Sequence, residues 1–464
     1  MGIFRKKVHF IGVSGIGVSA TAFLSIKRGY KVTGSAVESN KLVENLKNMG
    51  MKFYLGHRKE NIDDVDLIVR SAAVRDENPE VKEALRKGID VLYYSRYLGM
   101  LMSEKQGIAI AGTHGKTTTT AMVATILKHS GLEPEVVCGG IMNEFKSNAI
   151  YGDGKYFVAE ACEYNRSFLD LSKSYGIITN IEADHLDYYG TFENILESFR
   201  EFIEKTEPPG YLFVNGDDPS IHKIVNPSDI ELIKVGYSEK NDVLIKNVTK
   251  IDGSYSYNLT PNGNKFNKYL KDPLMLKLKI PGRFNIINSA LSSLLALRLG
   301  VERKDVEESL RNFKGTERRM EIVGKYLNNP VISDYAHHPT EISVTLDTLK
   351  DVYPNKKLML IFQPHQYSRT AFLFEEFVKA LVKADYLVIT EIYEQRDSEE
   401  YLKMVRSDDL FKQVKKVKRE KAFFVKNLED LQDFIVSFVK SDDYVIIFMG
   451  AGSIDHYARS FINT

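Results

Sequence analysis

The first hundred residues alternate between short apolar runs and longer stretches with a helical period. Residues 8–11 predict a buried strand, residues 12–17 a glycine-rich turn, and the residues up to about Arg28 a helix that Gly29 ends. Residues 30–34 and 66–69 predict two further strands, and residues 41–48 a helix capped by Ser39 or Asn40. This succession of strand and helix is typical of a parallel sheet covered by helices.

The same alternation of strand and helix is predicted after residue 107. Residues 107–111 predict a strand that enters the sequence GTHGKTTTT, which opens a helix ending at His129, and strands follow at 156–160 and 175–180. Residues 243–278 instead alternate apolar and polar side chains around Asp252-Gly253 and Asn262-Gly263, two hairpin signals. They predict a small antiparallel patch beside the parallel strands, before a helix at 285–299.

A third unit begins near Arg318, with strands predicted at residues 330–333, 357–362, 386–390 and 444–448. The chain has 464 residues, which is the length of about three domains. We therefore predict an α/β protein of three αβ domains, with boundaries at 1–106, 107–317 and 318–464. The first and third are Rossmann-like, and the second is a phosphate-loop ATPase-type domain that carries the antiparallel patch.

Composition narrows the class of protein. Lys and Arg number 63 against 62 Asp and Glu, so the chain lacks the positive excess that a nucleic-acid partner requires. The two cysteines, Cys138 and Cys162, form no CxxC pair and favour a reducing compartment. No apolar run reaches the roughly 20 residues that cross a bilayer, and the basic N-terminus lacks a signal-peptide core. We expect a cytoplasmic protein with no membrane or nucleic-acid partner.

The most specific local pattern lies between the strand at 107–111 and the helix after it. Glycines there let backbone N–H groups approach phosphate oxygens, and the helix N-terminus adds partial positive charge. Lys116 would reach the β- and γ-phosphates of a nucleotide, and the Thr117 hydroxyl would ligate Mg²⁺. Ile110 stands where the usual spacing has its first glycine, so a turn that binds nothing is the alternative. The predicted loop comprises Gly112, Thr113, His114, Gly115, Lys116, Thr117 and Thr118.

Two further polar groups follow strands of the same unit. Glu160 ends the strand at 156–160, and Asp184-His185 comes shortly after the strand at 175–180. The carboxyl ends of parallel strands meet at the edge of the sheet where the phosphate loop also lies. Glu160 and His185 could therefore hold a second Mg²⁺ beside the γ-phosphate, although an Asp-His pair is also common as a helix cap.

The motifs occur in a recognisable order. GTHGKTTTT is followed by AEACE, NIEADHLDYYGTFE, PGRFNIINSA, FKGTERRME, SDYAHHPTE, FQPHQYSRT and MGAGSID. Taken with VHFIGVSGIGVSA near the N-terminus, this set resembles the Mur ligase family of ATP-dependent peptidoglycan ligases over the whole chain. The resemblance implies an enzyme that uses ATP and two Mg²⁺ ions to join L-alanine to the lactyl carboxylate of UDP-N-acetylmuramate through an acyl phosphate.

The resemblance also implies roles for individual residues. Asn285, with Asn288 nearby, would lie on the adenine side of ATP, and Asp334 would bind its ribose. Arg319 would reach the phosphates from the domain junction. The implied catalytic residues are Lys116, Glu160, His185 and Arg319, and the implied magnesium ligands are Thr117, Glu160 and His185.

In the third unit, the resemblance implies a set of residues that face the substrate cleft: His337, His338, His365 and Arg369. Without the resemblance, Arg318-Arg319 would fit a solvated linker, His337-His338 a polar turn or helix cap, and Asn285 a helix cap. The sequence departs from the family pattern at several positions, among them those where the usual His, Arg and Asp are replaced by Phe284, Gln366 and Ala36.

The glycine-rich turn at residues 12–17 resembles a dinucleotide-binding loop. A nicotinamide-dependent dehydrogenase would need an acid at the end of the second strand, where this chain has Ser35 and Ala36. A UDP-sugar fits better, because the loop would take its diphosphate while Ser71 and Ala72 line the uridine side. The predicted UDP-sugar residues are Gly12, Ser14, Gly15, Ile16, Gly17, Ser71 and Ala72.

Several functional alternatives remain beside the L-alanine ligase. A recycling ligase would attach a preformed murein tripeptide to UDP-N-acetylmuramate and shares most of these motifs. A dehydrogenase and a UDP-muramoyl-sensing regulator are more remote, and the presence of Lys116, Glu160, His185 and Arg319 argues against the regulator. We expect a monomer or a weak homodimer.

Overall fold

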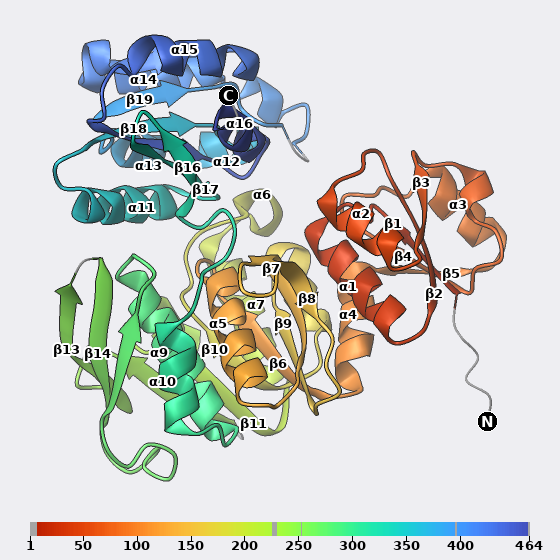
Figure 1. Ribbon diagram of the computed structural model, residues 1–464. Helices are drawn as coiled ribbons and strands as arrows, with labels where there is room; N and C mark the ends of the chain where they lie inside the picture. Colours follow the sequence, from red (N-terminus) through yellow and green to blue (C-terminus); the bar gives the residue numbers. More distant parts are fainter. Residues whose placement is uncertain (1–6, 225–229, 252, 395–396, 463–464) are drawn as a thin grey trace, which may run out of the picture.

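The computed structural model describes residues 7–224, 230–251, 253–394 and 397–462, and these residues form three separate sheets, each with helices packed on it (Figure 1). The predicted α/β fold with three sheet-centred parts is therefore confirmed. Within the described residues, no helix has both the length and the apolar character that a membrane span needs. Asp252 of the first predicted hairpin turn lies outside the described residues, as do the first six residues.

The first sheet is parallel throughout and has the strand order β3-β2-β1-β4-β5. The short strands β3 and β5 escaped the sequence prediction because only four residues form each of them and they are half-exposed. Its strands are β1 (Lys7–Ile11), β2 (Lys31–Ala36), β3 (Lys52–Leu55), β4 (Leu67–Arg70) and β5 (Asp90–Tyr93). Its helices are α1 (Ile16–Lys27), α2 (Lys41–Asn48), α3 (Pro79–Arg86) and α4 (Tyr94–Ser103), with a 3₁₀ turn η1 (Lys59–Asn61).

The central sheet has ten strands in the order β15-β14-β13-β12-β11-β10-β6-β9-β7-β8. Its strands are β6 (Gln106–Ala111), β7 (Glu135–Met142), β8 (Ser147–Ile150), β9 (Tyr156–Glu160), β10 (Lys173–Ile178), β11 (Thr206–Asn215), β12 (Glu231–Gly236), β13 (Val243–Ile251), β14 (Ser254–Pro261) and β15 (Leu274–Leu278). Its helices are α5 (Lys116–His129), α6 (Leu186–Tyr189), α7 (Phe192–Glu204), α8 (Pro219–Ile224), α9 (Phe284–Arg298) and α10 (Arg303–Arg311), with a 3₁₀ turn η2 (Tyr164–Asp170).

The predicted antiparallel patch is present as β13–β15, which continue the central sheet at one edge. The prediction of a hairpin turn at Asn262-Gly263 is wrong, because β14 ends at Pro261 and β15 begins only at Leu274. Asn262 instead uses its carboxamide to donate hydrogen bonds to the carbonyls of Glu239 and Asn241. A second antiparallel pair, β7 with β8, lies at the other edge of the sheet.

The third sheet has the order β16-β17-β21-β18-β19-β20 and is parallel except for β16. Its strands are β16 (Glu321–Tyr326), β17 (Asn329–Asp334), β18 (Lys357–Phe362), β19 (Tyr386–Ile389), β20 (Ala422–Phe424) and β21 (Tyr444–Met449). Its helices are α11 (Pro339–Val352), α12 (Tyr367–Phe372), α13 (Phe374–Leu381), α14 (Ser407–Lys418), α15 (Leu431–Phe438) and α16 (Ile454–Phe461).

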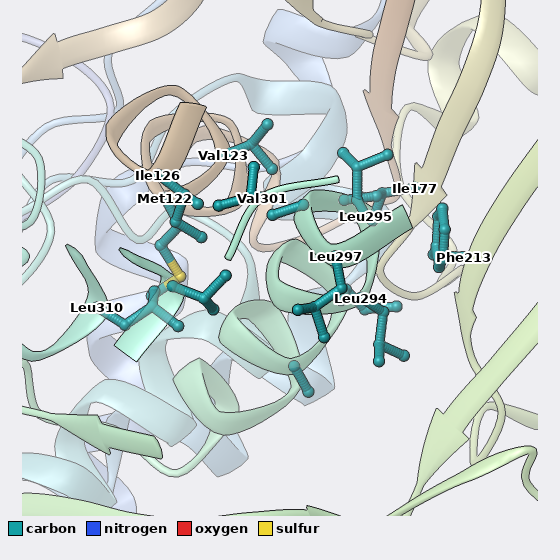
Figure 2. Packing of buried hydrophobic residues seen from close by; sticks show 14 of the residues in the cluster. Met122, Val123, Ile126, Ile177, Phe213, Leu294, Leu295, Leu297, Val301 and Leu310 are labelled. Atoms are coloured by element: carbon teal, nitrogen blue, oxygen red, sulfur yellow. The ribbon is translucent and has the colours of Figure 1, made fainter. Parts of the chain in front are cut away.

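The largest apolar core fixes the helix that follows the phosphate loop. Figure 2 shows Met122 and Ile126 of α5 near Leu310 of α10, with the leucines of α9 beside Ile177 and Phe213 of the sheet. Every one of these side chains is almost fully removed from solvent. Burial of one such side chain contributes about 1.5–3 kcal/mol, so α5 and the loop at its start are held firmly against the sheet.

Candidate active site

The predicted strand–loop–helix unit lies between β6 and α5. Gly112 and Gly115 have φ angles of 131° and 83°, which glycine adopts with little strain. A Cβ on Gly112 would lie 2.0 Å from the Thr179 hydroxyl oxygen, and one on Gly115 would lie 2.8 Å from the Asn288 carboxamide oxygen. The glycines therefore let the loop pass close to its neighbours and turn directly into the N-terminus of α5, where anions are favoured.

Lys116 lies folded back over this loop. Its Nζ donates hydrogen bonds to the carbonyls of Gly112 (2.6 Å) and Thr113 (2.9 Å) and forms an ion pair with Glu163 at 2.9 Å. Burial opposes the charge on Lys116, but the carboxylate of Glu163 outweighs it and raises the pKa of the amine above its ordinary value. A permanent cation thus lies beside the loop, held by the carboxylate of Glu163, for which the motifs predicted no role.

The predicted magnesium ligands come from three neighbouring segments. The Thr117 hydroxyl donates to Glu160 Oε1 at 3.0 Å, and the Gly139 N–H donates to Glu160 Oε2 at 2.7 Å. His185 precedes α6 with a φ of 54°, and its Nδ1 is buried with no hydrogen-bond partner among the described residues. Paired hydroxyl and carboxylate oxygens suit Mg²⁺, so Thr117 and Glu160 fit the ion. No hydrogen bond or ion pair between described residues joins His185 to either of them.

A cavity of about 610 Å³ lies between the phosphate loop and the third domain. Asn285 and Asn288 line it from α9, where Asn285 donates to the Pro281 carbonyl (2.6 Å) and accepts from Asn288 (3.1 Å). Phe284 also lines the cavity, with 36% of its surface exposed. The predicted nucleotide residues on the wall are His114, Gly115, Thr118, Asn285, Asn288, Arg319 and Asp334, whereas Gly112, Thr113, Lys116 and Thr117 are not on it.

Arg319 and Asp334 reach the cavity from the domain junction. Asp334 accepts hydrogen bonds from the N–H groups of Met320 (2.7 Å) and Ala336 (2.8 Å), and burial raises its pKa to about 6 against the opposing effect of Arg319. Arg319 pairs with Glu341 at 3.7 Å. Arg318 is not a solvated linker residue, because its guanidinium donates to the carbonyls of Gly450 (2.7 Å) and Gly452 (3.1 Å).

His114 lies between carboxylates from two domains. Its Nδ1 is 3.1 Å from Glu341 of α11, and its Nε2 is 3.4 Å from Glu182, which follows β10. Burial opposes protonation, but these two carboxylates raise the pKa of His114 to about 9. The phosphate loop therefore carries a second cation, and an ion pair ties it to the third domain. The motifs did not predict a role for Glu341, although its place in the first turn of α11 is visible in the sequence HPTE.

The ligand atoms of His114, Glu182 and His338 lie within 4.8 Å of one another, the one such trio among the described residues. The His338 ring is already engaged, because Nε2 donates to the Ala183 carbonyl (3.2 Å) and Nδ1 accepts from the Thr340 N–H (3.3 Å). His338 thus caps α11 and contacts the central domain at once, so the trio fits domain docking better than a metal site.

The remaining third-domain residues form one cluster. Arg369 donates from Nε to Asp184 Oδ1 at 3.1 Å, and its Nη1 lies 3.2 Å from His365 Nδ1. The rings of His337 and His365 are 5.9 Å apart. Burial lowers the pKa of His337 well below its ordinary value. Because Asp184 immediately precedes His185, this contact brings the amino-acid side of the predicted site up to the predicted metal histidine.

The glycine loop of the first domain follows β1. Gly12 has a φ of 79°, its N–H donates to the Ser35 carbonyl (2.8 Å), and a Cβ there would lie 3.1 Å from the Ser71 Cβ. Asn40 donates to the Ser14 carbonyl at 2.9 Å and also caps α2. The residues predicted to bind a UDP-sugar therefore meet at the carboxyl edge of this sheet, with Ala72 exposed beside Ser71.

The strand–loop–helix geometry, with a cavity closed by a third sheet domain, defines a phosphate-loop protein assembled from three αβ domains. Three family descriptions match it in order: "Mur ligase family, catalytic domain" at residues 7–106, "Mur ligase middle domain" at 110–296, and "Mur ligase, glutamate ligase domain" at 318–452. The chain belongs to the Mur ligase family, as its motifs predict.

Individual relatives cover almost the whole chain. A UDP-N-acetylmuramate–L-alanine ligase from Aquifex aeolicus is 39% identical over 457 residues, which is 98% of this chain and 97% of the relative. The solved UDP-N-acetylmuramate-alanine ligase from Thermotoga maritima is 32% identical with a TM-score of 0.83 and 98% coverage of both chains. A murein peptide ligase from Psychrobacter arcticus shares the fold at 22% identity, a TM-score of 0.75 and coverages of 99% and 98%.

Proposed function

We propose that this protein is the ATP-dependent ligase that joins L-alanine to the lactyl carboxylate of UDP-N-acetylmuramate in cytoplasmic peptidoglycan precursor synthesis. The observation that carries the proposal is full-length similarity, at 39% identity, to a ligase of that name. The surroundings of His185 support it, because the charges of Lys116 and Arg369 both act on this histidine, and a nucleotide site and an amino-acid site must adjoin for ligation.

The proposed ATP site is the cavity beside the phosphate loop. Lys116 would hold the β- and γ-phosphates and Arg319 would reach them from the domain junction, while Asn285 and Asn288 face adenine and Asp334 the ribose. Thr117, Glu160 and His185 would hold magnesium, which when bound neutralises phosphate charge. We further propose that the functional domains are 1–106, 107–317 and 318–464, the first binding UDP-N-acetylmuramate at residues Gly12–Gly17, Ser71 and Ala72.

The chemistry explains why cations surround this site. A carboxylate cannot expel oxide at neutral pH, so the lactyl carboxylate first attacks the γ-phosphate of ATP and becomes an acyl phosphate, releasing ADP. Lys116 and Arg319 would stabilise the charge that spreads over the transferred phosphoryl group. The amine of L-alanine then attacks the acyl carbon, and phosphate leaves. Enclosure between domains keeps water from the acyl phosphate.

Two alternative functions, a recycling ligase and a dehydrogenase, have less support than the L-alanine ligase. The murein peptide ligase, which represents tripeptide recycling, is only 22% identical, so it supports the shared fold alone. For a dehydrogenase, a carboxylate does lie near the end of β2, but this Glu80 is fully buried and accepts hydrogen bonds from Ser35 and Asn61. It has no room to bind a ribose.

We propose a protein that acts as a monomer or weak homodimer.

An ADP-release assay with ATP and UDP-N-acetylmuramate tests the proposal. We expect release that depends on L-alanine, and a product whose mass equals that of both substrates less one water. Release that depends only on the murein tripeptide would instead identify the recycling ligase. Reduction of NAD by the chain would identify a dehydrogenase. The absence of ADP release with every amine would contradict ligase activity.

A further inference from the structure

Glu341 is a carboxylate of the third domain that lines the cavity beside the phosphate loop and has no role in the chemistry proposed above. It lies in the first turn of α11, on the side of the third domain that faces the central domain (Figure 1), and its side chain is 12% exposed. Its Oε2 accepts the His337 N–H at 3.1 Å. Its Oε1 lies 3.1 Å from His114 Nδ1 and 3.7 Å from Arg319 Nη1. One carboxylate therefore joins the phosphate loop, the domain junction and the third domain.

His114 has a carboxylate on each side of its ring. Nδ1 faces Glu341 and Nε2 lies 3.4 Å from Glu182 Oε2, and an ionised carboxylate only accepts hydrogen bonds. Both ring nitrogens should therefore carry hydrogen. Burial opposes this charge, but the two carboxylates raise the pKa of His114 to about 9, and the His338 ring also faces it with centres 4.8 Å apart. With both nitrogens engaged, the ring is a bridge between carboxylates and not a ligand of phosphate.

The contacts form a closed circuit between α11 and the central domain. Thr340, next to Glu341, donates from Oγ1 to Glu182 Oε2 at 2.7 Å. Glu182 faces His114, and His114 faces Glu341 in turn. Separation of the domains would leave His114 without one of its carboxylates and Glu341 without its cations, which is costly for charges this far from water. The circuit therefore holds the first turn of α11 against the phosphate loop.

Arg319 depends on the same turn for its orientation. Among the residues that the structure describes, Glu341 is the one carboxylate that forms an ion pair with its guanidinium. The face of the Tyr335 ring, 5.2 Å away, attracts the charge but does not direct individual N–H groups. Loss of the Glu341 charge should therefore leave Arg319 a cation but free to turn from the cavity.

We propose that Glu341 is a positioning residue for phosphoryl transfer: it orients Arg319 directly, and through His114 it fixes the phosphate loop beside that arginine. The reacting phosphate would thus meet a fully assembled set of cations only when α11 is docked. The inference rests on the proposed function, because that function assigns Arg319 to the transferred phosphoryl group.

Steady-state ADP release by the full-length Glu341→Gln variant at pH 6.5 tests the Arg319 contact. Glutamine keeps an oxygen for the His337 N–H, so the turn is retained while the charge is lost. We expect kcat to fall at least about tenfold while the KM for ATP stays within about threefold, because an oriented arginine acts mainly in the transition state. A change that merely loosened the fold would not be confined to kcat.

Glu182→Gln is the matched comparison, because it removes the other carboxylate from His114 and leaves Glu341 on Arg319. It should lose at most about threefold in kcat at pH 6.5. Asp347→Asn, at an exposed carboxylate of α11 that pairs with Lys383, is the control and should leave kcat unchanged.

¹⁵N NMR of histidine-labelled chain, assigned with His114→Gln, gives a readout without ligand. Each glutamine variant places an NH₂ against one ring nitrogen, so each should lower the pKa of His114 from about 9 to below about 8. The alkaline fall in ADP release should move to lower pH in the same two variants, whereas Asp347→Asn should change neither the pKa nor the pH profile.

The outcomes separate this inference from the ligase function. If the native chain ligates L-alanine but folded Glu341→Gln keeps a near-native kcat, or loses no more than Glu182→Gln, the inference alone is overturned. An unchanged pKa of His114 in folded Glu341→Gln also overturns it. If Glu341→Gln does not fold, Glu341→Asp decides, because its shorter reach should still lower kcat, and a native kcat would overturn the inference. A native chain without amine-dependent ADP release overturns the proposed function, and this inference with it.

Discussion

Lys116 and Lys173 are two largely buried lysines of the central domain, and they lie at opposite edges of its sheet. Lys116 follows β6 at the carboxyl edge, where two carbonyls and Glu163 hold its ammonium. Lys173 begins β10 at the amino edge, and its Nζ has no hydrogen-bond partner among the described residues, only the face of Phe202 at 3.9 Å. Burial lowers the pKa of Lys173 to about 7, whereas Glu163 keeps Lys116 cationic.

The difference shows that burial alone does not mark a functional charge. At the carboxyl edge, the cation has a carboxylate partner, which an incoming phosphate would replace in the proposed function. At the amino edge, the same side chain is held in an apolar setting that favours its neutral form and weakens the fold. Paired changes at the two lysines therefore separate activity from stability.

The largest effect should come from Lys116→Ala. Removal of one phosphate-holding charge should lower L-alanine-dependent ADP release at least ~100-fold while the chain stays folded by circular dichroism. Lys173→Met, the matched change at the other edge, should leave this rate within about twofold of the native chain. Near-native ADP release from folded Lys116→Ala would remove Lys116 from the phosphate site.

The next effect concerns stability. Lys173→Met should raise the free energy of unfolding by about 1–3 kcal/mol at pH 7, because an apolar side chain replaces an amine without a partner. Lys173 has a folded pKa of about 7, below the roughly 10.4 of an unfolded lysine. Between these values only the unfolded chain holds the proton, so the native chain gains stability as pH rises. The advantage of the variant should therefore shrink from pH 7 to pH 10.

Urea unfolding of both chains at pH 7 and pH 10 measures this. The exposed Lys271→Met is the control and should change stability by no more than about 0.5 kcal/mol at either pH. An advantage of Lys173→Met that is the same at both pH values would contradict the neutral-lysine interpretation.

A smaller effect is expected for magnesium. Glu160→Ala and His185→Ala should each raise the Mg²⁺ concentration for half-maximal ADP release by about tenfold, since each would remove one ligand. If the two residues share an ion, the double variant should need little more Mg²⁺ for half-maximal ADP release than the single variant with the higher Mg²⁺ requirement. His222→Ala, at an exposed histidine of the same domain, should change nothing. Simply additive effects would place the two residues on different ions.

Local patterns predicted the regular elements well where sequence and burial agree. The helix at 41–48 is observed with those bounds, because Asn40 accepts the Val43 N–H at 3.1 Å as a cap. The strands at 156–160 and 357–362 are also observed as predicted. The strands β3, β5, β7, β8, β11, β12, β16 and β20 were missed. Five of them, β3, β5, β8, β16 and β20, lie at a sheet edge, where the apolar pattern is weak, whereas β7, β11 and β12 lie inside the central sheet.

The candidate site was also predicted only in part from the sequence. Short motifs found Lys116, and the fold does bring Thr117 to Glu160. They could not find partners such as Glu341, which contacts His114 across 227 positions of the chain, or Asp184, which contacts Arg369 across 185. Such pairs depend on how the domains meet, and no local spacing encodes that. The family resemblance implied a role for Arg369 but did not predict its contact with Asp184.

The central claim is that the carboxyl edge of the central sheet activates the lactyl carboxylate before the amine takes part. Rapid quench of the chain with ATP and UDP-N-acetylmuramate, without L-alanine, followed by borohydride reduction, traps the acyl phosphate as a muramoyl alcohol. We predict that alcohol from the native chain, a similar yield from Arg369→Ala, and almost none from Lys116→Ala. No alcohol from the native chain, or an undiminished yield from Lys116→Ala, would contradict the account.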